Sequence, residues 1–453
     1  MSEVPQPWQS ALDVIIPHAS EPRVLAVARE AGWGLPRVPL AQFWAVELSQ
    51  ITQTLRQEWG ITTAVLRRVA AQLNEAQHQV SLTYLLENRS PQWEPPAYGR
   101  WIGRPALNEL TDVLPAQRTA LEDYLTEAAG GEIPALRAPW ARPGWLDEAT
   151  AWIEAQLRAL GTPPIMPVEQ VKNWGISCVL RVRTTRGMRY FKATPALPLF
   201  ANEPLVMAGL AQMFPDHIAA PLRADAQRRW MLMQDFGPLL AHDGSMLARA
   251  AMIREFCSIQ RTSAARVDDL WRMGCVDRCL ERLAGQLAGL LTDAEALAGL
   301  SAHEHERLQS LVPHLQRLCT RLAQGPVPQT LVHGDLYMKN VAYNAGQYRF
   351  FDWSDACVTY PFFDMMIIYT ERNPRVYLPL RDTYLTLWTD YAPMAQLLDT
   401  WELAAPLSYL HQAIGYQHIA TGLEPAIRPE CHSAVSYYVR QALQAITPRH
   451  LEL

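Results

Sequence analysis

The stretch from Leu331 to Asp364 decides the fold, and it reads LVHGDLYMKNVAYNAGQYRFFDWSDACVTYPFFD. Short apolar runs alternate in it with polar and turn-forming residues, a pattern that predicts short strands. The predicted elements are a strand at 331–332, a strand at 341–343, a turn at 344–346 and a returning strand at 348–351. We expect the hairpin formed by the last two strands to bring Asp352 back beside Asn340.

Three polar side chains in this stretch have a spacing that suits phosphoryl transfer. Asp335 is followed five positions later by Asn340, and Asp352 comes twelve positions after that. One carboxylate can accept the proton of an attacking hydroxyl, while an amide and a second carboxylate offer hard oxygen ligands to Mg²⁺. A single Asp or Asn in a loop is usually a turn or capping residue. The prediction therefore depends on the whole set, with a hairpin between the two metal ligands.

The stretch resembles the aminoglycoside phosphotransferase and choline kinase-like family, whose pattern is H-G-D-x-x-x-x-N followed by Asp-Trp or Asp-Phe, then Pro and Asp. The matching residues are His333-Gly334-Asp335, Asn340, Asp352-Trp353, Pro361 and Asp364. The resemblance covers about residues 168–450. It implies an α+β protein of protein-kinase-like bilobal fold, with a five-stranded N-lobe and a mainly helical C-lobe. It also implies ATP and Mg²⁺ as cofactors and a hydroxyl group of a small molecule as acceptor.

The resemblance assigns a role to each polar residue of the stretch. Asp335 would be the catalytic base, and Asn340 and Asp352 would hold Mg²⁺. His333 would support the loop, and a direct part for it in proton transfer stays open. Asp364 would tie the catalytic loop in place.

Residues upstream are expected to hold the nucleotide. Lys192 lies near the end of a predicted third strand, where kinases place the lysine that contacts the α- and β-phosphates. Glu203 is the expected ion-pair partner, because it is the only Glu between Lys192 and Gly237. Alternatively, Glu203 is a favourable charge at a helix N-terminus, since Pro204 suits a first helical turn. The other expected nucleotide neighbours are Ser177, in a loop with a single glycine, and Met233, Gln234 and Phe236 at the hinge.

The acceptor side departs from both reference patterns. The gap from Asp352 to Asp364 is too short for a peptide-docking activation segment, which favours a small-molecule acceptor over a protein. The glycine that usually precedes the Pro of the family pattern is absent, since the segment reads Val358-Thr359-Tyr360-Pro361. Asp355 either approaches the acceptor or caps a turn. An aminoglycoside, a sugar and an amino alcohol all stay open as acceptors.

The sequence predicts four regions along the chain. Residues 1–135 form a small α+β domain, 136–167 a Pro-rich linker with a helix, 168–237 the N-lobe and 238–453 the C-lobe. In the first region we expect strands at 23–28, 61–70 and 79–86 and helices at 40–59 and 107–128. In the C-lobe we expect helices near 245–262, 275–293, 301–323, 362–371, 379–391, 400–420 and 430–446. A regulatory or acceptor-shaping cap and simple structural support are both open for residues 1–135.

Composition bounds the class of protein. The chain has 453 residues with a net charge of −5 and seven Cys that form no C-x-x-C pair. The charge gives no reason to expect nucleic acid or an anionic membrane as partner, and the Cys pattern argues against a disulfide scaffold or zinc site. No apolar run is long enough to span a bilayer and no signal peptide is evident, so we expect a cytoplasmic protein.

A different class of function also has to be weighed. The chain would be a non-catalytic nucleotide-binding module if its output were a contact made by residues 1–135. The intact set of Asp335, Asn340 and Asp352 argues against that alternative, because a module without catalysis has no need to keep all three. The sequence gives no basis for the oligomeric state or for a preference between ATP and GTP.

Overall fold

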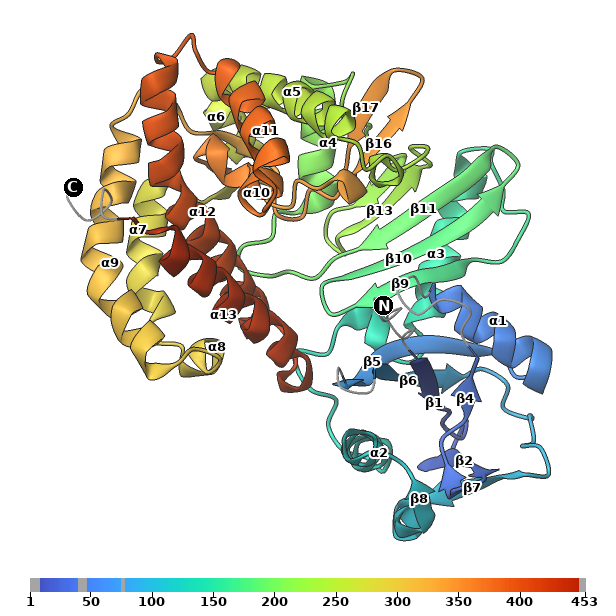
Figure 1. The fold of residues 1–453 in the computed structure, drawn as a ribbon. Coiled ribbons are helices and arrows are strands. Elements are labelled where there is room, and N and C mark those ends of the chain that lie inside the picture. The colour runs from blue at the N-terminus through green and yellow to red at the C-terminus, as the bar shows by residue number, and fades with distance from the viewer. Residues whose placement is uncertain (1–8, 40–46, 75–77, 448–453) are drawn as a thin grey trace, which may run out of the picture. The chain divides into compact units, whose positions relative to one another are not determined.

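The chain has a mixed α+β fold with several small sheets and many helices (Figure 1). The computed structural model describes residues 9–39, 47–74 and 78–447, and the chain divides into two compact units, 1–195 and 196–453. Among the described residues, no helix is both long enough and apolar enough to cross a membrane. The four regions expected from the sequence stay a prediction.

The first unit opens with a four-stranded sheet in the order β4-β1-β6-β5. Its strands are β1 (Gln9–Ile15), β4 (Arg37–Val38), β5 (Thr63–Asn74) and β6 (Gln79–Asn88), and β1 runs parallel to β6. Alternating residues of β1 such as Leu12 and Val14 are fully buried against helix α1 (Leu48–Trp59). The helix ends at Trp59, and Gly60 follows it with a φ of 68°, a left-handed cap that glycine adopts without strain. Residues 40–46 of the expected helix lie outside the described residues.

A second four-stranded sheet has the order β7-β2-β3-β8. Its strands are β2 (Arg23–Arg29), β3 (Gly32–Gly34), β7 (Gly99–Gly103) and β8 (Leu110–Asp112). The helix expected over 107–128 was predicted too long, because helix α2 covers only Pro115–Ala128. Leu110 instead pairs with Trp33 in a parallel ladder, and Pro115 takes the first helical turn, where its missing N–H costs no hydrogen bond.

The end of the first unit contains helix α3 and a three-strand antiparallel meander. Its elements are α3 (Trp145–Ala159), β9 (Glu169–Trp174), β10 (Ser177–Thr184) and β11 (Gly187–Ala193). The buried Gln170 side chain on β9 hydrogen-bonds both backbone groups of Val65 on β5, at 2.7 and 2.8 Å. These bonds fix the meander to the N-terminal sheet within this unit.

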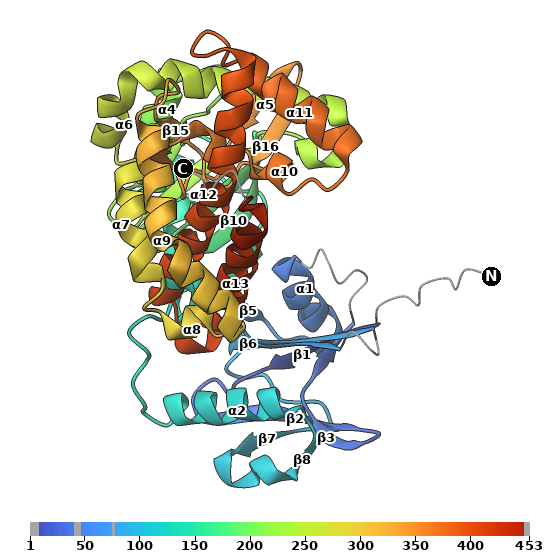
Figure 2. The ribbon, with the colours of Figure 1, turned by 60° about the vertical axis from the view of Figure 1, so that its left-hand side comes forward.

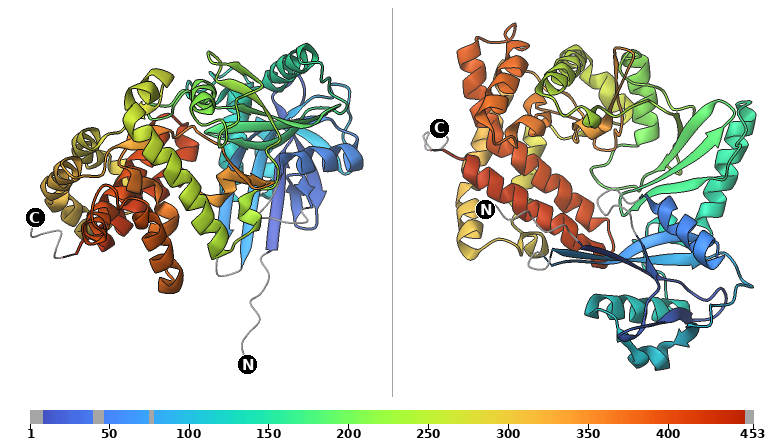
Figure 3. Two further views of the ribbon diagram at one scale, coloured as in Figure 1. Left: turned by 90° about the horizontal axis from the view of Figure 1, so that it is seen from above. Right: turned by 45° about the vertical axis from the view of Figure 1, so that its right-hand side comes forward.

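The second unit contains helix α4 (Glu203–Met213) and a hairpin of β12 (Arg223–Asp225) and β13 (Trp230–Gln234). The remaining longer helices are α5 (Met246–Ser263), α6 (Val267–Met273), α7 (Leu280–Leu290), α9 (Ala302–Ala323), α11 (Pro374–Thr386), α12 (Met394–Thr421) and α13 (Arg428–Ala445). Figures 2 and 3 show α12 and α13 packed side by side.

Several helix predictions in this unit were wrong in extent, including the one at 379–391, where α11 covers Pro374–Thr386. The helix expected from 275 begins only at Leu280, because β14 (Val276–Asp277) pairs with β18 (Cys357–Thr359). The segment 362–371 holds the end of a 3₁₀ helix (Pro361–Asp364) and the short helix α10 (Met366–Tyr369). The sequence did not predict α6 or the short helix α8 (Ala294–Leu297). Residues 276–277 had been assigned to a helix, but they pair with a strand that lies far away in the sequence.

The central stretch folds as the sequence predicted. Strand β15 (Thr330–Val332) leads into the loop, and β16 (Val341–Asn344) and β17 (Gln347–Phe350) form an antiparallel hairpin. Ala345 and Gly346 close the hairpin with φ of 50° and 84°, which is the two-residue turn that matches strand twist. The sheet β14-β18-β15 supports the entry to the loop.

Candidate active site

Asp335 and Asn340 are joined directly across the loop that follows β15. The Nδ2 group of Asn340 donates to Asp335 Oδ2 and to the Asp335 carbonyl oxygen, each at 2.8 Å. Asn340 is buried and Asp335 is half-buried. Because both bonds use the amide nitrogen, the Oδ1 oxygen of Asn340 is the atom left to bind a cation.

Asp352 lies next to this pair through the hairpin. The backbone N–H of Phe351 donates to the Asn340 carbonyl oxygen at 3.1 Å. This bond holds the end of the hairpin against Asn340, and Asp352 is the next residue in the chain. Asp352 has a φ of 69°, a left-handed conformation that costs a non-glycine residue about 1–2 kcal/mol. Such strain is found where surrounding structure fixes a functional side chain.

The amide oxygen and the carboxylate suit Mg²⁺ better than a metal enclosed entirely by protein. Within the described ranges, no group of three or more His, Cys, Asp or Glu side chains is placed to hold a metal ion. Mg²⁺ commonly keeps several waters and binds through one or two protein oxygens together with phosphate oxygens. Asn340 and Asp352 fit that pattern.

His333 is fully buried beneath the loop, and both of its ring nitrogens have partners. Nε2 lies 2.9 Å from the Phe351 carbonyl oxygen and so donates to it, while Nδ1 accepts from the Asp335 N–H at 3.4 Å. Its ring packs on Trp353 with centroids 4.5 Å apart. These contacts favour the supporting role for His333 over a direct part in proton transfer.

Asp364 ties the loop from below. Its two oxygens accept the backbone N–H groups of His333 at 2.7 Å and Gly334 at 2.9 Å. Complete burial raises the pKa of Asp364 to about 7, although hydrogen bonds from His333, Gly334 and Gln260 act in the opposite direction.

Gly334 has to be glycine at this point of the loop. Its φ is 85°, and a Cβ placed on it would lie 2.6 Å from the Asp355 Cβ and 2.7 Å from the Asp355 carbonyl oxygen. Asp355 therefore packs against the loop backbone. This position does not decide whether Asp355 approaches the acceptor or caps a turn, and both alternatives stay open.

Glu203 makes a contact that the sequence did not reveal. It is the first residue of α4, followed by Pro204, as expected, and it is completely buried. Its carboxylate accepts the Trp353 N–H and the Ser354 hydroxyl, each at 2.9 Å. Glu203 thus fixes the backbone immediately after Asp352.

Two expected nucleotide contacts belong to the first unit. Lys192 lies on β11 opposite Val179 and is buried, and Ser177 is the first residue of β10. Because Glu203 belongs to the other unit, the ion pair between Lys192 and Glu203 stays a prediction.

The expected hinge follows β13. Met233 is buried, Gln234 is exposed, and the ring centroid of Phe236 lies 5.4 Å from that of Phe351. The Phe236 ring therefore lies close to the residue that precedes Asp352. Contacts of these three residues with a base stay a prediction.

Sequence reasoning missed Lys339. Its ammonium group lies 3.3 Å from Asp335 Oδ2, one residue before Asn340. A compositional signal was present, because Lys172, Lys192 and Lys339 are the only lysines among the 40 Lys and Arg residues. A chain that uses arginine almost everywhere has a lysine beside its expected catalytic carboxylate.

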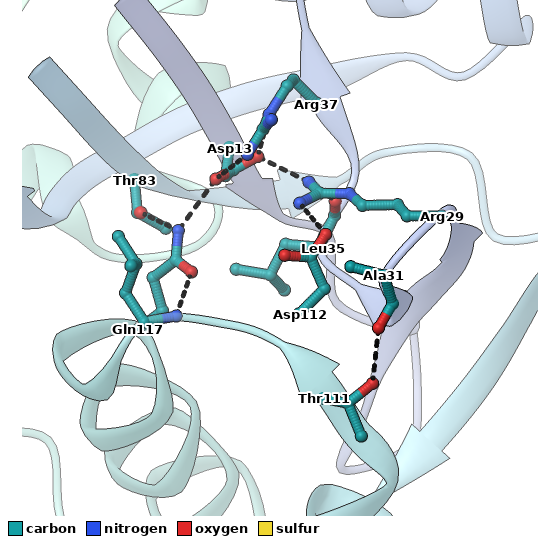
Figure 4. Close-up of polar contacts among 10 residues, drawn as sticks. Asp13, Arg29, Ala31, Leu35, Arg37, Thr83, Thr111, Asp112 and Gln117 are labelled. Carbon is teal, nitrogen blue, oxygen red and sulfur yellow. Dashed lines mark hydrogen bonds and ion pairs between the residues drawn. The ribbon is translucent and has the colours of Figure 1, made fainter. Parts of the chain in front are cut away.

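The N-terminal unit contains a separate polar cluster, to which the sequence assigned no role (Figure 4). Buried Asp13 on β1 accepts from Arg29 at 2.6 Å, from Arg37 at 3.0 and 3.2 Å, and from Gln117 at 2.9 Å. Gln117 also donates to Thr83 at 2.9 Å. These bonds join β1, β2, β4, β6 and α2, so the cluster serves as a polar core of this unit.

The resemblance drawn from the catalytic stretch is confirmed by comparison with known families. Residues 221–397 match the family described as "Phosphotransferase enzyme family". The matched segment contains His333, Asp335, Asn340, Asp352 and Asp364. A comparison with curated proteins finds no match.

Several solved structures align with this chain at low sequence identity. A macrolide 2'-phosphotransferase type I aligns at 14% identity with a TM-score of 0.46, covering 64% of this chain and 97% of that one. A choline/ethanolamine kinase family protein from Mesorhizobium loti aligns at 15% identity and 0.46, covering 68% and 98%. An ethanolamine kinase from Plasmodium vivax aligns at 11% identity and 0.47, covering 77% and 98%. With TM-scores below 0.5, these alignments support no statement about the substrate of this chain.

Proposed function

We propose, from the match of residues 221–397 to the phosphotransferase enzyme family, that this chain moves the γ-phosphate of ATP to a hydroxyl group of a small molecule. The proposal includes a protein-kinase-like bilobal fold with a five-stranded N-lobe. One observation carries it. Asn340 binds the Asp335 carboxylate at 2.8 Å, and the hairpin returns the chain to Asn340 immediately before Asp352.

In this proposal Asp335 is the catalytic base. Asn340 and Lys339 contact its Oδ2 atom and orient the carboxylate toward the acceptor. As the hydroxyl oxygen forms its bond to the γ-phosphorus, its proton passes to Asp335 and the bond to the β–γ bridging oxygen breaks. Phosphoryl transfer has a loose transition state, so positioning and charge neutralisation supply most of the rate enhancement.

Asn340 and Asp352 hold Mg²⁺ in the proposed enzyme. Mg²⁺ held by Asn340 and Asp352 would supply positive charge beside the phosphate oxygens. Glu203 keeps Asp352 in place by accepting the two hydrogen bonds from Trp353 and Ser354. The left-handed backbone of Asp352 is tolerated because these contacts fix the residues that follow it.

Lys192 and Ser177 contact the phosphates in this proposal, with Glu203 as the partner of Lys192. The adenine lies beside Met233, Gln234 and Phe236. The N-terminal part of the chain acts as a cap with a regulatory or acceptor-shaping role.

The test is transfer of labelled γ-phosphate from ATP to a panel of aminoglycosides, sugars, amino alcohols and hydroxy acids. Asp335→Asn serves as the blank, because we expect it to bind Mg·ATP and to transfer about 10²–10⁴ times more slowly. Asp352→Ala should lose both binding and transfer. Labelling at equal rates in the wild type and Asp335→Asn would refute the assignment of the base.

The same experiment addresses the alternative class. A non-catalytic nucleotide-binding module would bind Mg·ATP, label no acceptor and show no difference between wild type and Asp335→Asn in ATP hydrolysis. The contacts of residues 1–135 with a partner would then be the next subject.

A further inference from the structure

A cavity of about 600 Å³, wide open to solvent, lies beside the catalytic loop within the second unit. Tyr337, Met338 and Lys339 of the loop form one wall, and residues of α5, α10 and the segment after α10 form the others. Its volume falls in the range of small-molecule sites. Lys339 lines the cavity, and its ammonium group lies 3.3 Å from Asp335 Oδ2. This ion pair connects the cavity to the expected base.

The charged side chains around this cavity are mostly basic. Arg249, Lys339 and Arg372 are its cations, and Glu371 is the one carboxylate among the described residues that line it. Both oxygens of Glu371 are in use, since one accepts from Arg249 Nη1 and the other from the Asn373 N–H, each at 2.9 Å. The Asn373 bond and the Arg249 bond also lower the pKa of Glu371, so this carboxylate stays ionised.

Two of the cations keep binding capacity. Arg249 bonds Glu371 through Nη1 alone among the described residues, and its side chain is 28% exposed. Arg372 donates to the side-chain amide oxygen of Gln441. That amide is neutral, so this bond does not balance the positive charge of Arg372.

We propose that this cavity binds the acceptor, and that the acceptor carries a carboxylate or a phosphate monoester in addition to the hydroxyl that is phosphorylated. Arg249 and Arg372 bind the anionic group, and Lys339 lies between that group and Asp335. The inference rests on the proposed function, because it names the substrate class of the same site. The anionic group undergoes no chemical change during transfer.

The charge balance argues against the cationic acceptors that sequence analysis left open. An aminoglycoside or an amino alcohol would meet three positive side chains and a carboxylate whose two oxygens are already bonded. Like charges brought together in a binding site repel each other and disfavour the wrong ligand. The apolar part of the lining, Tyr337, Met338 and Ile367, suits the carbon skeleton of a small hydroxy compound.

The choice of lysine at position 339 agrees with this assignment. Arginine occupies the other two basic positions of the cavity, and its planar fork suits bidentate binding of a carboxylate or phosphate. The ammonium group of Lys339 is a compact point charge that can contact Asp335 and leave its other hydrogens for a phosphate oxygen.

The experiment uses matched pairs of probes that differ by an anionic group: glycerate against glycerol, and glucose 6-phosphate against glucose, with ethanolamine and kanamycin as cations. Binding is followed by the shift of the unfolding temperature of the full chain, saturated with Mg²⁺ and a non-hydrolysable ATP analogue. Saturation keeps the probes out of the nucleotide phosphate site. Binding of the analogue itself is measured first, and its failure would count against the proposed function rather than against this inference.

We expect at least one anionic probe to bind about tenfold more tightly than its neutral partner, and both cations to bind more weakly. Arg372→Gln and Arg249→Gln should each reduce the affinity for that probe about tenfold, since each removes one charge-assisted contact. Arg254→Gln is the matched control, because Arg254 is exposed on the same helix as Arg249 and does not line the cavity.

Arg249→Gln breaks the ion pair with Glu371 and so could also disturb the fold. Arg372→Gln leaves that ion pair in place, and its result therefore does not depend on the stability of Arg249→Gln. Equal binding of charged and neutral partners, preference for a cation, or unchanged affinity in Arg372→Gln would overturn the inference. Binding of no anionic probe at all would contradict it as well.

Discussion

The carboxylate of Asp364 accepts the backbone N–H of His333 at 2.7 Å, although the two residues are 31 positions apart. The same carboxylate accepts the Gly334 N–H at 2.9 Å. One buried side chain thus sets the backbone of the loop that presents Asp335. This arrangement has a pH-dependent cost, because a fully buried carboxylate resists ionisation.

Asp364 should make stability fall as pH rises from about 4 to about 7. Burial raises its folded pKa to about 7, above the unfolded value of 3.8, so its favourable contribution is complete below pH 3.8 and is lost through pH 7. Each pKa unit corresponds to about 1.4 kcal/mol. Urea unfolding at several pH values should show this slope in the wild type and a flatter one in Asp364→Asn. Identical slopes would show that Asp364 does not titrate in this range.

Gly334→Ala should destabilise the protein more than Gly346→Ala. Both glycines have φ near 85°, so both variants carry a left-handed penalty of about 1–2 kcal/mol. Only Gly334 would also place its new Cβ against Asp355, whereas Gly346 has nothing within 4 Å. That overlap should add about 1–3 kcal/mol, measured by denaturant unfolding. Equal losses would mean that the loop moves aside without cost.

Glu203→Ala should weaken Mg·ATP binding and lower stability by about 2–4 kcal/mol. The substitution leaves the buried N–H of Trp353 and the hydroxyl of Ser354 without their acceptor, at about 1–3 kcal/mol each. Ser354→Ala is the matched variant, since it removes one of the two bonds and should lose less in both measurements. Titration with Mg·ATP and chemical unfolding supply the readouts. Full nucleotide affinity in Glu203→Ala would separate this contact from the site.

Lys192→Ala should reduce nucleotide affinity about tenfold, which corresponds to about 1.4 kcal/mol. The expected reason is loss of a charge-assisted contact with the phosphates. Arg186→Ala serves as control, because Arg186 is an exposed cation in the turn between β10 and β11. An unchanged dissociation constant for Mg·ATP would remove Lys192 from the site.

Asp13→Ala should unfold the N-terminal part of the chain at lower denaturant concentration. The substitution leaves Arg37 and Gln117 without their buried acceptor, and removing one partner of a buried ion pair costs about 3–5 kcal/mol. Asp112→Ala should cost less, because Asp112 contacts Arg29 alone among these residues and its side chain is 35% exposed. Equal losses in the two variants would show that Asp13 is not the centre of the cluster.

The sequence by itself determined the local geometry of the site. Asp335, Asn340 and Asp352 lie within one hairpin and one loop, and residues so close in the chain are held together by turn chemistry and strand pairing. Hydrophobic alternation and turn residues therefore located β15, β16 and β17 to within a residue or two. The start of α4 beside Glu203 was equally local, because Pro204 marks a first helical turn.

Only the tertiary structure decided the contacts between distant segments. Glu203 meets Trp353 across 150 positions and Arg249 meets Glu371 across 122, and no local pattern encodes which carboxylate finds which donor. The strand pairing of Val276–Asp277 with β18 likewise overrode a helical periodicity that extended to residue 275. Packing of the whole unit selects such partners, because burying one polar group requires a complementary group brought there by another segment. The basic cavity beside Lys339 is a product of that selection, and so its charge was visible only once α5, the catalytic loop and the segment after α10 stood together.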